Sequence, residues 1–576
     1  MTFELDPRVS TEAGCIAVCG LALTTHQLFR RLETYSIAVH LLLLTAPPLI
    51  GSGLLGFTLP LFYAIVASLT LFYSTLLTSV VLYRLSPFHP LARYPGPLPC
   101  RLTKFWMARI GLNGDQHTYM KELHDLYGDV VRTGPNELSF RDPSILSAML
   151  GPSGVPKGPL MVGRIRTTTN LPLPGIMDTA VHHERRKPWS RAFSAAALKE
   201  YEPRVSNRAN QLIEVLERQK GEVSLGVYIN YFACVHLFRL MLVELTWAYI
   251  FCRYDFMCDM AYGGGSELMR DGDKDGIWDT MGAGSPPATF IGHVPWFGMY
   301  AARLPFMSRP GKRMGVHCRE FTLRRLQRGS ERKDVFHYLS NEDLPDRAPP
   351  PEIQLVSDGI LAIIAGADTT SSGLTSLFFC LATHPDAYKR LQAEVDQFYP
   401  PGDNPCDPKH YRDMHYLTAA INETLRLYPP VPTGTQRQVP HRGQGVMLGS
   451  NYVPPGTALY LPPWSLHRDP RNFAPFTEGF WPERWLLATG RAPASEKTGM
   501  DFVHNDAAFL PFSHGPANCV GRPMAMQEMR AVACAVVQKF EVRLRAGWDP
   551  SAYEEGFKDF FMTRRPALPV TLHPRF

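Results

Sequence analysis

The 576 residues are 45% hydrophobic and 19% charged, which is typical of a folded protein with a large core rather than of a disordered chain. The net charge of +6 is modest for this length, and Lys and Arg form no long basic stripe, so nucleic-acid binding gains little support. The eleven cysteines lack the regular spacing of a disulfide framework or a zinc site. We therefore expect most of them to be reduced and buried.

The N-terminal region is far more apolar than the rest. The stretch Thr34–Tyr83 contains no Asp, Glu, Lys or Arg, and a membrane-spanning helix needs about 20 apolar residues. We predict two spans, near Ser36–Phe57, which the Pro-Pro pair at 47–48 interrupts, and near Leu59–Leu82. A weaker apolar run, Ala13–Phe29, is either a third span or an interfacial helix.

A basic flank follows the second predicted span. Between the end of that span and Asp115 there is no acidic residue, and this flank carries Arg84, Arg93, Arg101 and Lys104. The positive-inside rule therefore predicts that the region behind it lies in the cytosol. Because prolines forbid helix continuation, we divide the chain into a membrane anchor (1–86, with two or three spans), a proline-rich connector (87–100) and a large domain (101–576).

The large domain shows mainly helical periodicity, so we predict a mainly α fold with small β-sheets. Val130–Arg132 and Asn136–Phe140 are typical of a hairpin, and Thr457–Leu461 of a further strand. The segment Glu352–His384 is helical in pattern and apolar almost all round. Such a helix is expected to run through the middle of a domain.

One cysteine, Cys519, lies in a tight loop before a predicted helix at Met524–Phe540. A helix N-terminus stabilises a thiolate through its dipole and its free amide hydrogens. Gly515 allows a sharp turn, Gly521 allows a close backbone approach, and Phe512 can shield the sulfur from water. A cysteine in such a place is, taken alone, more often a buried structural residue.

This loop, Phe-x-x-Gly-x-x-x-Cys-x-Gly, resembles the haem-binding loop of the cytochromes P-450, in which a cysteine thiolate ligates the iron. Three further motifs occur in the order that this family shows, and the resemblance extends from about Pro95 to the C-terminus. It implies a haem-thiolate enzyme with Cys519 as the iron ligand.

The first of these motifs is Ala365–Thr370, inside the long apolar helix. The resemblance assigns it to the distal side of the haem. The Thr369 hydroxyl can bond back to the Ala365 carbonyl and open a groove, and Asp368 with Thr369 could relay protons. An Asp-Thr-Thr-Ser-Ser run is also typical of a helix cap, but the apolar residues on both sides argue against a cap here.

The second motif is Glu423 and Arg426, which lie three residues apart on one helical face. Alone, such a pair is usually a surface ion pair of little consequence. Downstream, Arg484 lies in an aromatic setting. The resemblance implies a buried structural network of Glu423, Arg426 and Arg484 with no catalytic role.

The third motif carries His182 and Arg186, four residues apart, and resembles the helix that reaches the haem propionates. The alternative is a solvated basic helix. Ala517 departs from the family, which often has Arg or His at its position as a propionate partner. Haem retention is therefore expected to depend on His182, Arg186 and also on Arg437.

A second departure is the largely apolar segment Cys234–Arg253, which interrupts what resembles one family helix. It is either a membrane-contacting segment or an intron retained in the gene sequence, and we favour the intron.

The resemblance implies a monooxygenase that contains haem b and takes electrons from NADPH through NADPH-cytochrome P-450 reductase, with cytochrome b5 as a further partner. It also implies attachment to the bilayer of the endoplasmic reticulum, with the catalytic domain in the cytosol. The expected pocket walls are Pro159–Asp178, Val431–Gly434 and Phe560–Met562. They are apolar, so a lipophilic small molecule is the expected substrate.

The multi-span anchor and the motif sequences resemble those of fungal family members that act in secondary metabolism, such as those that modify terpenoids. The alternatives are a haem-thiolate isomerase or dehydratase, which would need no proton relay, and a haem sensor, which would need no reductase.

Overall fold

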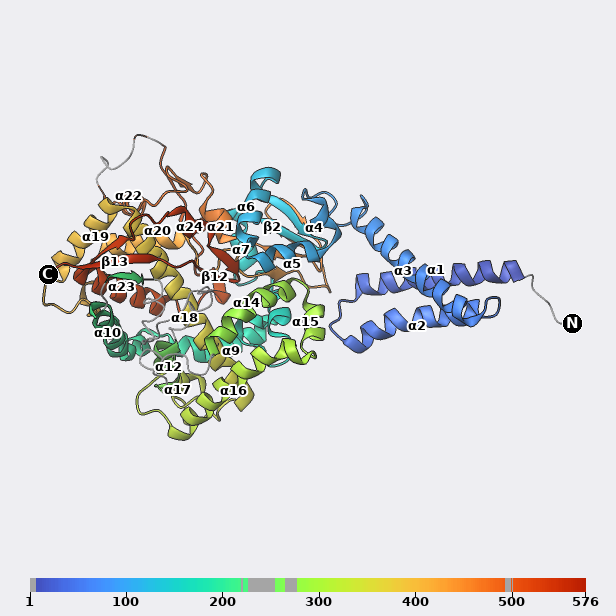
Figure 1. Cartoon of the computed structure of the whole chain (residues 1–576), viewed down its shortest axis with the longest axis horizontal. Coiled ribbons are helices and arrows are strands. Elements are labelled where there is room, and N and C mark those ends of the chain that lie inside the picture. The colour runs from blue at the N-terminus through green and yellow to red at the C-terminus, as the bar shows by residue number, and fades with distance from the viewer. Residues whose placement is uncertain (1–6, 219–220, 226–253, 265–276, 493–498, 500) are drawn as a thin grey trace.

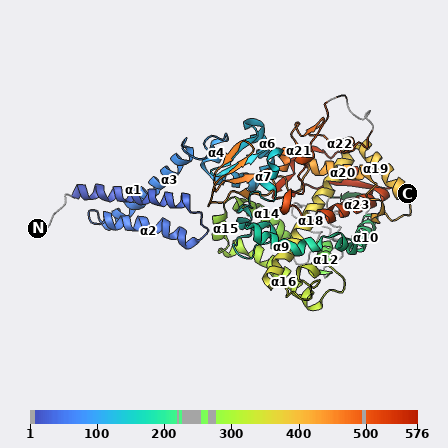
Figure 2. The same ribbon diagram turned by 180° about the vertical axis from the view of Figure 1, so that it is seen from behind.

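Three N-terminal helices, named the anchor here because they could serve as a membrane anchor, project from one end of a larger, mainly helical domain (Figures 1 and 2). The computed structural model describes residues 7–218, 221–225, 254–264, 277–492, 499 and 501–576. The segment Cys234–Arg253 lies outside these residues, so the membrane-contact and intron hypotheses for it stay predictions.

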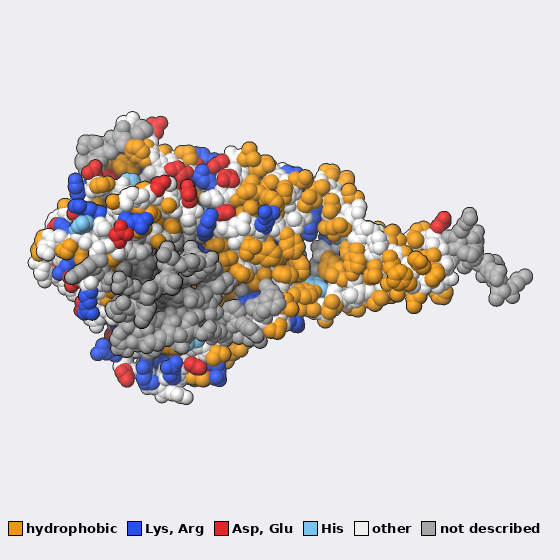
Figure 3. All heavy atoms as spheres, in the orientation of Figure 1, with side chains coloured by type: hydrophobic (Ala, Val, Ile, Leu, Met, Phe, Trp, Pro, Cys, Tyr) orange, Lys and Arg blue, Asp and Glu red, His pale blue; other side chains and the backbone are white. Residues whose placement is uncertain are grey.

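The anchor is a bundle of three helices, α1 (Pro7–Arg31), α2 (Ile37–Leu55) and α3 (Leu61–Leu85). By length and composition, α2 and α3 could each cross a membrane. The helix α1 packs along both, and its His26 lies 2.7 Å (Nδ1 to Oγ) from Ser79 of α3. Hydrophobic side chains cover the anchor and continue onto the neighbouring face of the domain (Figure 3).

The predicted interruption at Pro47 and Pro48 is wrong, because α2 continues through both residues. Pro48 has no N–H, so the carbonyl of Leu44, one turn earlier, loses its usual donor. The Tyr73 hydroxyl of α3 donates to that carbonyl at 3.0 Å. A neighbouring helix thus satisfies the backbone group that the proline leaves free, which is how prolines are tolerated in membrane helices.

The domain is built mainly from helices that pack around one long central helix, α18 (Glu352–Thr383). The others described are α4 (Leu98–Leu102), α5 (Lys104–Asn113), α6 (Gln116–Tyr127), α7 (Leu146–Leu150), α8 (Leu160–Ile165), α9 (Thr179–Ala192), α10 (Ala195–Glu217), α12 (Tyr254–Tyr262), α14 (Ile277–His293), α15 (Pro295–Ala301), α16 (Pro305–Arg328), α17 (Val335–Leu339), α19 (Pro385–Phe398), α20 (His415–Leu427), α21 (Pro463–His467), α22 (Glu483–Ala488), α23 (Arg522–Lys539) and α24 (Ser551–Glu555).

The central position of α18 confirms the prediction for Glu352–His384. Its second half, from Thr370 to Leu381, is buried. It contacts α12, α16, α20 and α23, so its apolar surface packs against protein rather than lipid.

The sheets are small, with two to four strands each. The largest has the order β1-β2-β7-β4, with β1 (Val130–Gly134), β2 (Glu137–Phe140), β7 (Ala458–Tyr460) and β4 (Arg437–Gln438). The antiparallel β1–β2 pair and β7 confirm the predicted hairpin and strand.

The remaining strands form a three-stranded sheet and three two-stranded pairs. They are β10 (Phe540–Leu544), β13 (Pro569–Pro574) and β3 (Glu222–Ser224), then β11 (Lys558–Phe560) with β12 (Met562–Arg564), β5 (Val446–Leu448) with β6 (Asn451–Val453), and β8 (Phe473–Ala474) with β9 (Val503–His504). The hairpin β11–β12 contacts α18.

Candidate active site

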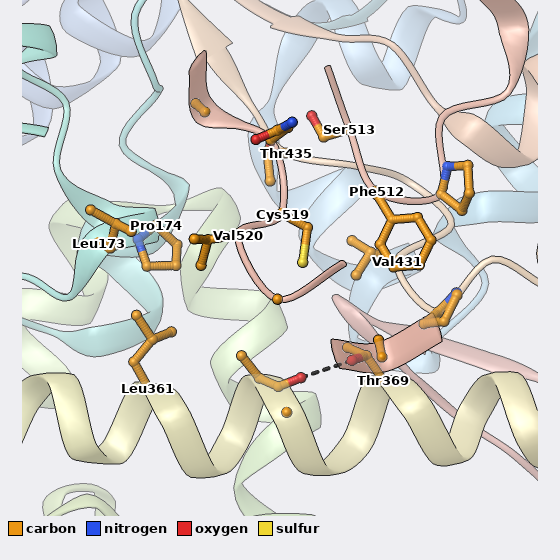
Figure 4. A pocket seen from close by; sticks show the side chains of 18 of the residues that line it. Leu173, Pro174, Leu361, Thr369, Val431, Thr435, Phe512, Ser513, Cys519 and Val520 are labelled. Atoms are coloured by element: carbon orange, nitrogen blue, oxygen red, sulfur yellow. Dashed lines mark hydrogen bonds between the residues drawn. The ribbon is translucent and has the colours of Figure 1, made fainter. Parts of the chain in front are cut away.

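A mostly apolar cavity of about 310 Å³ lies between the loop that carries Cys519 and the middle of α18. Figure 4 shows α18 crossing one side of this cavity, with Cys519, Phe512 and Val520 across from it. Each wall segment predicted from the sequence contributes to it, through Leu173 and Pro174, through Val431 and Gly434, and through Phe561.

The Cys519 loop is shaped by two backbone features. The amide of Cys519 donates to the carbonyl of Phe512 at 2.9 Å, which closes the loop. Gly515 has a φ of +71°, and a Cβ there would lie 2.0 Å from the carbonyl oxygen of Leu150. Glycine is therefore required at this turn, as the sequence predicted, both for its conformation and for the close approach of a neighbouring segment.

The sulfur of Cys519 faces the cavity, close to the start of α23. Among the cysteines that the structure describes, Cys519 is the exposed one, and the others are buried or half-buried. The surrounding protein nevertheless raises the pKa of the Cys519 thiol by desolvation, while the amides of Gly521 and Arg522 and the charge of Arg186 oppose that rise. These groups would stabilise a thiolate.

Open space lies beside the sulfur. A Cβ added to Gly521 would meet nothing nearer than 3.9 Å, and the nearest atoms would be the sulfur itself and Phe193. Glycine at 521 is therefore not required by the protein's own packing. It leaves room beside the sulfur that a bound cofactor could use.

Basic side chains gather at the same cavity. His182 and Arg186 of α9 line it together with Lys157. Burial, with smaller contributions from Lys157 and Arg186, lowers the pKa of His182 to about 4, and its Nε2 has no partner. Burial, with Arg437 and Arg186, lowers the pKa of Lys157 to about 7.

These lowered pKa values indicate a basic cluster without a nearby countercharge. Glu528 is the one acidic residue among the described residues that line the cavity. Two carboxylates, such as the propionates of haem b, would supply the missing charge, so the residues present fit that cofactor.

Sequence reasoning missed Lys157, since a lone lysine between Pro156 and Gly158 carries no recognisable pattern. Arg186 also makes contacts that the sequence did not predict. Its guanidinium donates to the backbone carbonyl and the side-chain oxygen of Asn518, each at 2.7 Å. It therefore holds the residue that directly precedes Cys519.

On α18, Thr369 lines the cavity and its hydroxyl donates to the carbonyl of Ala365 at 2.8 Å. This bond, drawn in Figure 4, is the one predicted from the sequence. Asp368, unlike Thr369, is not among the described residues that line the cavity. Its carboxylate lies 3.8 Å from the guanidinium of Arg565. The side chains of Asp368 and Thr369 leave the helix about 100° apart, so that of Thr369 faces the cavity and that of Asp368 does not.

Glu423 lies at the centre of a fully buried ionic network. Its carboxylate accepts two hydrogen bonds from Arg426, at 2.8 and 2.9 Å, and one from Arg484 at 3.0 Å. Burial alone would raise the pKa of Glu423, but Arg426 and Arg484 outweigh burial and lower it. Arg426 and Arg484 also donate to backbone carbonyls, including those of His467 and Pro475. The network ties α20 and α22 to the segment between them.

Known proteins similar to this chain are fungal haem enzymes. The chain is 30% identical to the cytochrome P450 monooxygenase FCK2 of Fusarium pseudograminearum, over 87% of this chain and 85% of that protein. It is 32% identical to cytochrome P450 67 of Uromyces fabae, over 84% and 86% of the two chains. The Cytochrome P450 family profile matches residues 321–569.

The chain belongs to the cytochrome P450 family. The protein is thus a haem-dependent monooxygenase, and it receives electrons from NADPH through a reductase, as is typical of the family. A further relative is the tryprostatin B 6-hydroxylase of Aspergillus fumigatus, 27% identical over 87% of this chain and 83% of that protein. Such relatives do not favour the isomerase or dehydratase alternative.

Proposed function

We propose that Cys519 is the thiolate ligand of the haem iron, within a loop shaped by Phe512, Gly515 and Gly521. The observation that carries this proposal is the position of its sulfur. It faces a cavity whose opposite wall is the Thr369 region of α18. When bound, haem with a thiolate ligand supplies the centre that activates oxygen for insertion into a C–H bond.

Around this centre, His182 and Arg186 bind the haem propionates, joined by Lys157 and Arg437. Arg437 is buried and its Nε has no partner, so it has capacity for a further hydrogen bond. Arg186 has a second task, because its bonds to Asn518 fix the Cys519 loop. Glu423, Arg426 and Arg484 have a purely structural role and hold the core on the Cys519 side.

Proton supply is the catalytic task of α18. The reaction puts one atom of O2 into the product and the other into water, which consumes two electrons from NADPH and two protons. Thr369 presents its hydroxyl to the cavity, and Asp368, whose side chain is 32% exposed and leaves α18 about 100° from that of Thr369, exchanges protons with water outside the cavity. The pair would carry protons from that water to the cavity, while the apolar walls keep bulk water out.

Residues 1–86 anchor the protein in the bilayer of the endoplasmic reticulum, residues 87–100 connect the anchor to the domain, and residues 101–576 form the catalytic domain on the cytosolic side. Two features support this division. The apolar helices form one bundle, and the flank behind α3 is basic. NADPH-cytochrome P-450 reductase, with cytochrome b5 as a further partner, would dock on the cytosolic side.

The substrate is a lipophilic small molecule, in keeping with walls formed by Leu173, Val431 and Phe561. A pathway of fungal secondary metabolism is the proposed setting, supported by the similarity to fungal monooxygenases and to a hydroxylase.

Isotope labelling tests this function. Full-length protein in lipid vesicles, with the reductase and NADPH, is incubated with a panel of lipophilic probes under 18O2. We expect one labelled oxygen atom per oxidised product. Unlabelled oxygen in the product, or turnover without NADPH, would contradict the proposal.

A further inference from the structure

The C-terminal hairpin β11–β12 contacts both the cavity and α18. Its tip residue, Phe561, lines the cavity, and the amide of Phe561 donates to the Asp559 carboxylate at 2.8 Å. The amide of Thr563 on β12 donates to the carbonyl of Pro430 at 3.1 Å, and its hydroxyl bonds to that of Ser372 on α18. The hairpin is therefore fixed to the central helix immediately after the Asp368–Thr369 motif.

Arg565 follows this hairpin and reaches the motif itself. Its guanidinium donates to the backbone carbonyl of Asp368 at 3.3 Å and to the Ser371 hydroxyl at 3.0 Å. The side chain of Arg565 is only 7% exposed, and its Nη2 lies 3.8 Å from the Asp368 carboxylate. Arg565 thus binds the backbone of Asp368 and lies beside its carboxylate, with which the charge of the neighbouring Arg564 also interacts.

The 3.8 Å separation has a chemical consequence. A direct charge-assisted hydrogen bond would measure about 2.7–2.9 Å and would occupy the carboxylate oxygens. At 3.8 Å the guanidinium attracts the carboxylate while leaving its oxygens free to exchange protons with water. The two hydrogen bonds to Asp368 and Ser371 keep the guanidinium itself in place.

We propose that Arg565 is a positioning residue for proton delivery: held by the hairpin, it fixes Asp368 on the side of α18 away from the cavity. This inference rests on the proposed function and deepens it. It predicts that the rate of proton delivery depends on a residue outside the described lining of the cavity.

The test uses full-length protein in lipid vesicles with the reductase and NADPH, without added substrate. NADPH oxidation is measured in H2O and in D2O, together with the fraction of NADPH that ends as H2O2. For Arg565→Gln we expect a rate roughly tenfold lower, because a misplaced catalytic group can cost up to about 100-fold. We also expect a larger solvent isotope effect and an altered H2O2 fraction. Arg565→Lys should show the same changes to a smaller extent.

Arg575→Gln is the matched control. Arg575 also lies in the C-terminal segment and pairs with a carboxylate, Asp396 of α19, at 2.6 Å, but it does not bind the Asp368 motif. It should keep the wild-type isotope effect and H2O2 fraction. A readout without turnover is the hydrogen exchange of residues 365–372, which Arg565→Gln should increase and Arg575→Gln should leave unchanged.

Wild-type isotope effects in both Arg565 variants would overturn the proposal. A merely structural role would lower the amount of thiolate-ligated haem protein without changing the isotope effect of the remainder, and that result would overturn it too. Failure of the proposed function is distinguishable, because the wild type itself would then show no thiolate-ligated haem and no NADPH oxidation.

Discussion

At the scale of single residues, the site depends on buried and half-buried charges, several of which have partners from distant parts of the chain. Arg186 of α9 binds Asn518 beside Cys519, and Arg565 from the C-terminal segment binds Asp368 of α18. Glu423 holds two arginines that are as fully buried as itself. Removing one partner of such a contact is expected to lower the stability of the fold, because it leaves the other charge buried without a countercharge.

Arg186→Ala is expected to lower the haem content of the purified protein. The change removes two hydrogen bonds to Asn518 and a proposed propionate ligand, and hydrogen bonds of charged groups contribute about 1.5–3 kcal/mol each. Haem retention should weaken roughly tenfold or more. The measurement is the haem-to-protein ratio after exhaustive dialysis. Lys187→Ala is the control, since Lys187 pairs with Glu184 on the outer surface of the same helix. Equal haem content in both variants would contradict the role of Arg186.

Glu423→Gln is expected to destabilise the fold by about 3–5 kcal/mol, because it leaves Arg426 and Arg484 buried without a countercharge. The free energy of unfolding in urea measures the effect. The exposed pair of Glu320 and Arg324 provides the comparison, and Glu320→Gln should change stability by about 0.5 kcal/mol or less. Similar small losses in both variants would mean that the network contributes little.

At the scale of elements, the best predicted part is α18, because an apolar pattern sustained over so long a segment is typical of a helix in the middle of a domain. The sequence also predicted the sharp turn at Gly515 and the bond from Thr369 to Ala365. It could not predict that α2 continues through Pro47 and Pro48, because the hydroxyl that compensates comes from Tyr73 on another helix. Lys157 and Arg565 were missed for the same reason, since their partners are set by tertiary structure.

The loop between α1 and α2 contacts the domain, and this contact is expected to depend on pH. Glu33 Oε2 lies 2.5 Å from Nε2 of His441 and also accepts from Gln438 on β4. The hydrogen bond with Glu33, reduced by burial, raises the pKa of His441. At a pH below the ordinary histidine pKa of about 6.5, the pair makes its full contribution to the stability of the contact. This contribution is lost as the pH rises through the raised pKa of His441.

Hydrogen exchange of residues 438–441, corrected for the intrinsic effect of pH, measures this dependence. We expect more protection at pH 6 than at pH 8 in the wild type, and no such difference in Glu33→Gln. Tyr300→Phe removes the bond between Tyr300 and His40 of α2 but leaves the Glu33 pair intact, so it should keep the difference. The same pH dependence in Glu33→Gln would exclude this origin.

At the scale of the whole molecule, the three anchor helices alternate in direction. The end of α1, the start of α2 and the end of α3 all lie next to the domain, and the α2–α3 turn lies at the far end (Figures 1 and 2). If each helix spans the bilayer, the region ahead of α1 and the turn at 56–60 lie in the lumen. Under the same condition, and with the domain in the cytosol as proposed, the loop at 32–36 would lie in the cytosol.

Engineered glycosylation sites test this topology. A sequon placed ahead of α1, or one at residues 56–60 with a suitable spacer, should be glycosylated in microsomes. A sequon at 32–36 should stay unmodified, as should the natural Asn422-Glu423-Thr424. Glycosylation at 56–60 without glycosylation ahead of α1 would instead indicate two spans, with α1 on the cytosolic surface.

The central claim is that Cys519 ligates the haem iron, and the carbon monoxide difference spectrum of the reduced full-length protein tests it most directly. We expect the red-shifted band of thiolate-ligated haem in the wild type and its loss in Cys519→Ser. Cys534→Ser, which alters a buried cysteine of α23, should keep the band. A thiolate band that persists in Cys519→Ser would contradict the account, because another cysteine would then have to be the ligand.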